Sequence, residues 1–85
     1  MPDVDLRMPD LGLPAGSVRV SLWLVDKGAT VAAGDRVLEL VADGVTVDLS
    51  APSDGTLKRT LVAEDDPVEV GLRLAVFATD TNDSA

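Results

Sequence analysis

Few side chains in this sequence of 85 residues could carry out chemistry. It has no cysteine and no histidine, so it lacks disulfides, thiolate metal sites and the commonest general base. Its five serines could act as nucleophiles, but there is no histidine to activate them. Paired carboxylates could act as acid and base only across a substrate cleft, which a small solid domain does not provide. These observations argue against most hydrolase and metalloenzyme mechanisms, and we interpret the chain as non-catalytic.

The charge balance is strongly acidic. Seven Lys and Arg stand against fifteen Asp and Glu, which gives a formal net charge of -8. A chain of this charge repels nucleic-acid phosphates and acidic membrane surfaces, so neither is expected as a partner. A protein partner with a basic surface fits best, although the same charge also keeps a small domain soluble. Glu39, Asp43 and Asp48 lack the close spacing of a calcium loop, so no metal site is predicted.

The length and the ends of the sequence give expectations about boundaries and location. The first residues do not combine a basic start with an apolar run, and no segment approaches the ~20 apolar residues of a membrane span. The chain is therefore predicted to be cytoplasmic. Its length fits one domain, which we place at residues 1–79, followed by a polar tail or linker start at residues 80–85.

Short runs of valine and leucine, broken by Gly, Pro and Asp, predict an all-β chain. The clearest run spans residues 18–24, where alternate apolar residues share one face of a strand. Trp23 falls on the opposite face in this pattern. There it could anchor a partner or, as we favour, pack against a neighbouring loop or chain end.

A tight hairpin is predicted at Asp43-Gly44. Asp-Gly between alternating apolar residues is typical of a type I′ turn, which needs positive φ at both central residues. The register around this turn sets Glu39 opposite Asp48, a like-charge pair that should cost about a few tenths of a kcal/mol. On the other face the register predicts three apolar pairs: Ala42 with Val45, Leu40 with Val47, and Leu38 with Leu49.

An internal repeat with an offset of 37 residues supports the all-β prediction. It aligns Gly34 with Gly71 and Arg36 with Arg73. The repeat also favours a strand over a short helix for residues 57–66, whose apolar spacing alone does not alternate. Each half is too short to bury its own apolar face, so the repeat predicts two sheets related by a two-fold axis and sharing one core.

Five segments together resemble one known family over roughly residues 8–78: residues 8–12 (MPDLG), 23–28 (WLVDKG), 31–40 (VAAGDRVLEL), 51–57 (APSDGTL) and 68–75 (VEVGLRLA). Their order and spacing are similar to the lipoyl domains of 2-oxo acid dehydrogenase acyltransferase subunits, within the biotinyl/lipoyl attachment family. The resemblance implies a flattened barrel or sandwich of two four-stranded antiparallel sheets with an internal pseudo-two-fold. It places the chain ends in one sheet and the modified hairpin at the far tip of the other.

The departure from the family falls on the attachment position. In the family the hairpin turn reads Asp-Lys, and the lysine amine takes lipoate, or biotin in the Met-Lys-Met version. Here the resemblance implies that Asp43 is the retained residue and that Gly44 stands where the lysine would be. Glycine has no side chain, so no attached cofactor is expected; in the family it would be lipoate in preference to biotin. Ala29, where the family usually has Asp, is a second departure that concerns only its own turn.

Three interpretations of the missing lysine remain open. The chain is a lysine-less module that acts by noncovalent protein contact, or a lipoyl carrier domain inactivated by mutation, native or engineered. The third is an unusual carrier modified at Lys27 or Lys58. Lys27 lies beside the turn residue Gly28 and Lys58 lies within a predicted strand. Because neither is at a hairpin tip, we interpret both as ordinary surface lysines and rank the third interpretation last.

Overall fold

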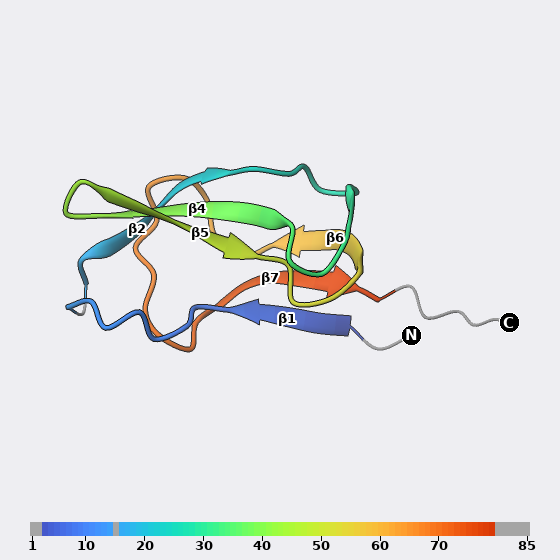
Figure 1. Cartoon of the computed structure of the whole chain (residues 1–85), viewed down its shortest axis with the longest axis horizontal. Helices are drawn as coiled ribbons and strands as arrows, with labels where there is room; N and C mark the ends of the chain where they lie inside the picture. Colours follow the sequence, from blue (N-terminus) through green and yellow to red (C-terminus); the bar gives the residue numbers. More distant parts are fainter. Residues whose placement is uncertain (1–2, 15, 80–85) are drawn as a thin grey trace, which may run out of the picture.

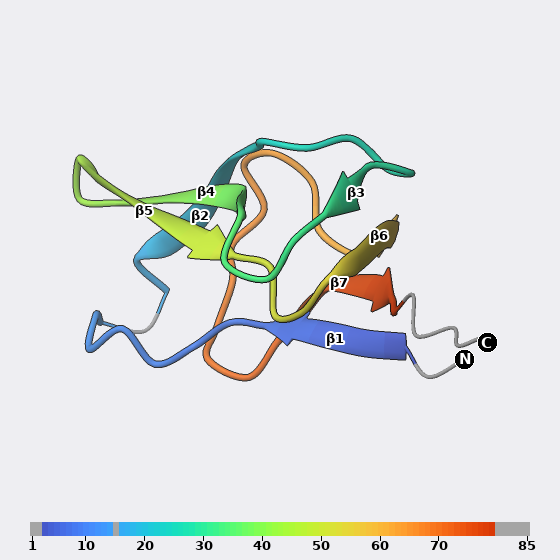
Figure 2. The same ribbon diagram turned by 45° about the vertical axis from the view of Figure 1, so that its right-hand side comes forward.

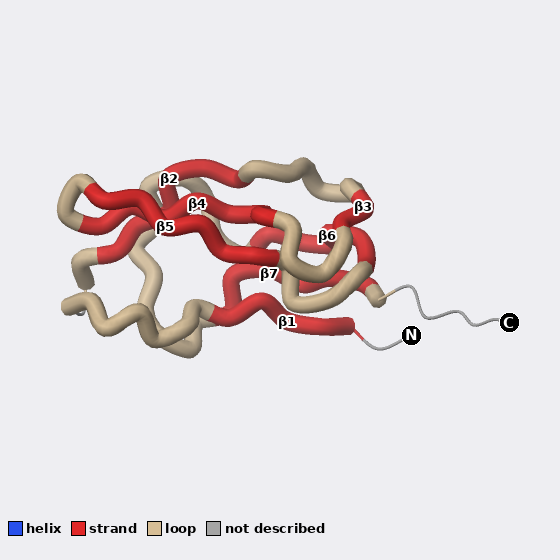
Figure 3. Tube along the Cα trace, viewed as in Figure 1, coloured by secondary structure: helices blue, strands red, loops and turns tan. Residues whose placement is uncertain are grey.

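The computed structural model describes residues 3–14 and 16–79, and every regular element among them is a β-strand (Figures 1 and 3). These residues include no helix of the length and apolar character that crossing a membrane requires. The polar tail predicted at residues 80–85 lies outside the described residues. The strands are β1 (Asp3–Arg7), β2 (Val18–Trp23), β3 (Thr30–Val31), β4 (Arg36–Ala42), β5 (Val45–Ser50), β6 (Gly55–Thr60) and β7 (Arg73–Ala78).

Two antiparallel sheets face each other, as the sequence predicts (Figure 2). One has the strand order β1-β7-β6-β3 and the other β2-β4-β5. The second sheet differs from the expected four strands, because an isolated bridge between Arg19 and Pro67 takes the fourth place. Beside this bridge, Val20 N donates to Asp66 O at 2.9 Å. Proline has no N–H to donate, so the segment makes only part of a strand's hydrogen bonds.

The 37-residue repeat corresponds to a structural repeat with the same offset. β2 and β6 match end for end at this offset, and the starts of β4 and β7 match as well. The hydrogen bonds repeat too: Leu24 N donates to Val37 O and Leu61 N donates to Leu74 O, both at 2.9 Å. The predicted internal repeat is therefore confirmed at the level of single hydrogen bonds.

The core lies between the two sheets and is aliphatic apart from one phenylalanine. Successive residues of a strand point to opposite faces, so each sheet contributes its inner row of side chains. Full burial of a Leu, Val or Phe side chain contributes roughly 1.5–3 kcal/mol. The largest core side chains with under 2% exposure are Phe77, Leu38, Leu40, Leu57, Leu74, Val20 and Val37.

A β-bulge in β2 changes the face on which Trp23 lies. The pairing with β4 shifts between Val20 and Leu22, and one extra residue reverses the alternation of side chains. The prediction that Leu22 and Leu24 share the inner face with Val20 is therefore wrong, since each is 40% exposed. Trp23 instead packs against the core, and its Nε1 donates to Val62 O at 3.0 Å. The expected packing of Trp23 against a neighbouring loop is confirmed.

Two of the turns are closed by a carboxylate in the same way. Asp66 Oδ2 accepts a hydrogen bond from Ala63 N at 2.8 Å, and Asp66 N donates to Ala63 O at 3.1 Å. Asp35 makes the same reciprocal pair with Ala32, at 2.9 and 3.0 Å. Such local bonds satisfy backbone groups that a turn would otherwise leave to water.

The turn at residues 26–29 lacks this carboxylate, and supplying it should stabilise the domain. Ala29 is the repeat equivalent of Asp66, and Ala29 N donates to Asp26 O at 2.9 Å, but alanine offers no acceptor to the Asp26 N–H. We expect Ala29→Asp to raise the free energy of unfolding by about 0.5–1.5 kcal/mol and Asp66→Ala to lower it by a similar amount. Urea unfolding followed by Trp23 fluorescence measures both. A loss in Ala29→Asp would show that the two turns are not equivalent.

Candidate functional site

The β4–β5 hairpin has the predicted register and turn. All four predicted cross-strand pairs are present, including Ala42 opposite Val45 and Leu38 opposite Leu49. Asp43 has φ 49° and Gly44 has φ 78°, the two positive values that a type I′ turn requires. The Asp-Gly sequence therefore fixes the tip, while the apolar inner row fixes how the strands leave it.

The hairpin tip projects into solvent at one end of the molecule. In Figure 1 it lies at the opposite end from the start of β1 and the end of β7, where Asp3 pairs with Ala78. Asp43 and Gly44 are exposed, and the next residue, Val45, is 61% exposed. A Cβ atom added at Gly44 would meet nothing within 4 Å. The two predicted site residues are therefore accessible to a large partner and do not lie in a pocket.

The like-charge pair below the tip is held by one partner for each carboxylate. Ser21 Oγ donates to Glu39 Oε2 at 2.8 Å, and Arg36 Nη1 lies 3.2 Å from Asp48 Oδ2. These contacts offset the repulsion that the sequence predicts between Glu39 and Asp48. Within residues 3–14 and 16–79, no group of three or more acidic side chains lies close enough together to hold a metal ion.

Both lysines lie away from the hairpin. Lys58 is in β6, and its Nζ lies 3.0 Å from Asp3 Oδ2, at the end of the molecule opposite the tip. Lys27 is in the turn before β3, which lies against β6 because Gly28 N donates to Leu57 O at 2.8 Å. Neither amine is presented on a tight, projecting turn like that of the β4–β5 hairpin.

An open hollow of about 240 Å³ lies between the β1–β2 loop and residues 68–70. Its lining is apolar, with Met8, Leu11 and Val18 among its walls and Glu69 as its one carboxylate. Ligand pockets are usually larger, about 300–1,000 Å³, and acid–base hydrolysis needs two carboxylates facing one cleft. The hollow therefore does not provide the site that paired-carboxylate chemistry would need. The sequence alone gave no sign of it, because it depends on how the loop folds back on β2.

This fold and hairpin define a small all-β domain of the carrier type, with a projecting turn at one end and its chain ends at the other. The family model described as "Biotin-requiring enzyme" matches residues 4–77, and the chain belongs to this biotin/lipoyl family. The predicted family and fold are thereby confirmed.

The similar proteins point to the lipoyl branch of the family. The chain is 37% identical over 71 residues to the dihydrolipoyllysine-residue acetyltransferase component of the acetoin cleaving system of Pseudomonas putida, covering 84% of this chain and 19% of that protein. It is 35% identical to the corresponding component of the pyruvate dehydrogenase complex of Corynebacterium glutamicum, covering 84% and 10%. The lipoyl domain of the Azotobacter vinelandii 2-oxoglutarate dehydrogenase complex has the same fold, with a TM-score of 0.71, 21% identity and coverage of 89% and 96%. The chain spans a fifth or less of these two curated relatives.

Proposed function

We propose that this chain is a carrier-type domain without an attachment lysine, which acts by noncovalent contact with protein partners. The observation that carries the proposal is the hairpin tip, where Asp43-Gly44 forms a well-built turn but offers no side-chain amine. A covalent lipoyl or biotinyl group does not fit this tip, because an amide link needs the nitrogen of a lysine. The domain is then a non-catalytic part of a larger assembly.

The structure below the tip supports a role in which a partner protein recognises the shape of the hairpin. The register, the turn and the two carboxylate contacts at Glu39 and Asp48 are all intact. We would not expect a hairpin without any remaining role to keep its register, its turn and these two contacts. The partners we propose are proteins with a basic surface, because the chain carries a net charge of -8, and the compartment we propose is the cytoplasm.

A second candidate is a lipoyl carrier domain whose lysine has been replaced. It is favoured by the names of the relatives, which are dihydrolipoyllysine-residue acetyltransferase components, and by the open space around Gly44. In this case the native form would carry acyl groups or electrons on a lipoyl-lysine arm within a 2-oxo acid dehydrogenase-type complex. A gene that encodes lysine at position 44 would favour this candidate, and one that encodes glycine would favour the first.

Coexpression with a lipoyl ligase tests whether the tip lacks only its amine. We expect Gly44→Lys to gain the mass of one lipoyl group and the chain as sequenced to gain none, measured by intact-protein mass spectrometry. Position 44 has room for the side chain, and the left-handed backbone costs a non-glycine residue only about 1–2 kcal/mol.

Gly34→Lys is the matched control for this experiment. Gly34 is also exposed, has φ 92° and has nothing within 4 Å of an added Cβ, but it lies in a different turn. Modification of Gly34→Lys as well would mean that any exposed lysine suffices. Modification of the chain as sequenced would place the attachment at Lys27 or Lys58 and contradict the proposal. If no variant is modified, the ligase does not recognise this hairpin, and the lost amine is not the only change at the tip.

A further inference from the structure

The basic residues of this acidic chain gather on the outer face of β1, β7 and β6. Four of the seven, Arg7, Lys58, Arg59 and Arg73, lie there with only two acidic residues, Asp3 and Asp5. We call these six residues the basic face. These three strands contain no other acidic residue, and the remaining basic residues, Arg19, Lys27 and Arg36, lie outside them. The net charge of -8 therefore conceals a face of the opposite sign.

The strand register establishes that these side chains share one face. Asp5 and Arg59 both pair with Val76, from the two sides of the central strand β7, so all three side chains point the same way. Val76 is 2% exposed but does not belong to the core cluster between the sheets. It is buried on the outer face instead. Lys and Arg lay their aliphatic stems on apolar surface and keep the charge in water. The long basic side chains beside Val76 are therefore suited to cover it.

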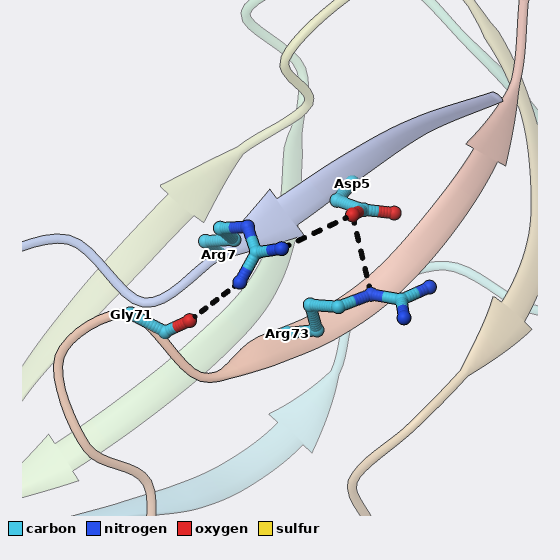
Figure 4. Close-up of polar contacts among 4 residues, drawn as sticks. All are labelled: Asp5, Arg7, Gly71 and Arg73. Carbon is cyan, nitrogen blue, oxygen red and sulfur yellow. Dashed lines mark hydrogen bonds and ion pairs between the residues drawn. The ribbon is translucent and has the colours of Figure 1, made fainter. Parts of the chain in front are cut away.

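One carboxylate and one carbonyl fix two of the guanidinium groups (Figure 4). Asp5 Oδ2 lies 3.2 Å from Arg73 Nε and 3.6 Å from Arg7 Nη2, and Arg7 Nη1 donates to Gly71 O at 2.9 Å. The contact to Arg73 uses Nε, and Figure 4 shows its two terminal nitrogens pointing away from Asp5. These contacts hold Arg73 in place but leave its best donors for a carboxylate unused.

Arg59 differs from the other three basic residues of the face, which each pair with Asp3 or Asp5. It is exposed, and its side chain makes no hydrogen bond or ion pair with the described residues. A guanidinium binds a carboxylate through two parallel N–H donors, which gives stronger and more directed contacts than an ammonium. The basic face thus combines a prearranged Arg73 with an unpaired Arg59.

We propose that the basic face binds an acidic segment of a partner protein. Guanidinium donors beside a buried apolar residue suit a peptide that carries several Glu or Asp side chains. At an ionic strength of about 0.15 M the Debye length is about 8 Å, so salt largely screens the acidic rest of the surface from a short segment that stays on the face. An extended polyanion such as nucleic acid, or an acidic membrane, reaches beyond the face and is repelled. This interface is separate from the hairpin and does not depend on whether residue 44 carries a cofactor.

The test uses a labelled octaglutamate peptide as the probe. Fluorescence anisotropy should show saturable binding at an ionic strength of about 0.15 M, where the Debye length is about 8 Å, and binding should weaken toward 1 M, where the Debye length is about 3 Å. In amide chemical-shift mapping by NMR, the perturbed residues should lie in β1, β6 and β7. Arg59→Glu should weaken binding about tenfold, because it replaces an attractive contact with a repulsive one.

Lys27→Glu is the matched control, because it changes the net charge by the same amount. Lys27 is also exposed, and its side chain makes no hydrogen bond or ion pair with the described residues. The substitution should change the affinity by less than about twofold. Equal losses in the two variants would overturn the proposal, because they would show a response to total charge alone. Shifts confined to the hairpin end, no saturable binding, or equal affinity for a single-stranded oligonucleotide would overturn it as well. The shift map of the unmodified chain decides the question even if Arg59→Glu fails to fold.

Discussion

Replacing Gly55 with alanine is expected to lower the free energy of unfolding by about 3 kcal/mol. A Cβ atom at this position would overlap the carbonyl oxygen of Ala78 and crowd the backbone of Thr79. These are backbone atoms at the end of β7, and Ala78 pairs with Thr56, the residue after Gly55. They cannot move without breaking the join between β6 and β7. The glycine of the APSDGTL segment is therefore required, because the backbone at the end of β7 approaches it closely.

Gly34→Ala separates this clash from the ordinary cost of replacing a glycine. Gly34 has φ 92° and nothing within 4 Å of an added Cβ, so its substitution should cost only the left-handed backbone penalty of about 1–2 kcal/mol. Urea unfolding curves followed by Trp23 fluorescence give both values from their midpoints and slopes. Equal losses for the two variants would show that β7 yields easily at Ala78.

The parts of the fold that the sequence predicted well are those that local chemistry determines. Asp43-Gly44 allows positive φ at two adjacent residues, and the apolar alternation on either side then leaves one register that buries the inner row. The 37-residue repeat was also visible in the sequence, because equivalent turns in the two halves need equivalent residues. Family membership followed from the order and spacing of five such local segments.

The irregularities in strand pairing could not be predicted from the sequence. The bulge between Val20 and Leu22 moves Trp23 to the inner side, and no residue type in that run marks where the extra residue will be accommodated. The second sheet likewise ends in a single bridge at Pro67, where the proline weakens the pairing but does not abolish it. Both features arise from how the two sheets fit together, which a period-two pattern does not contain.

The candidate site was predicted only as far as its position in the chain. Asp43 and Gly44 lie at an exposed tip as expected, but the partners that hold Glu39 and Asp48 come from β2 and from the far end of β4. The basic face was hidden for the same reason. Its charges are spread from residue 3 to residue 73 and become neighbours only across β7, so the total charge predicted a basic partner and gave no sign of an acidic one.

Truncating Phe77 is expected to have the other large effect on stability. Phe77 is fully buried in β7, the central partner of β1 and β6, and pairs with Val4 and Leu57. Phe77→Ala should lower the free energy of unfolding by about 3–5 kcal/mol, because it leaves a cavity in a core that has no other aromatic ring at its centre. Phe77→Leu should cost less and provides a folded comparison if the alanine variant unfolds.

Val76→Ala is the contrast that tests which face of β7 is the core. Val76 is nearly as buried as Phe77, but adjacent residues of a strand point to opposite faces, and the strand register sets Val76 between Asp5 and Arg59 of the basic face. Long flexible side chains can settle into the space that truncation leaves, whereas the two packed sheets cannot. Val76→Ala should therefore cost only about 1–2 kcal/mol, close to the transfer free energy of the lost methyl groups. A loss as large as that of Phe77→Ala would mean that the covering layer is packed as rigidly as the core, and its arginines would then be less free to turn toward a partner.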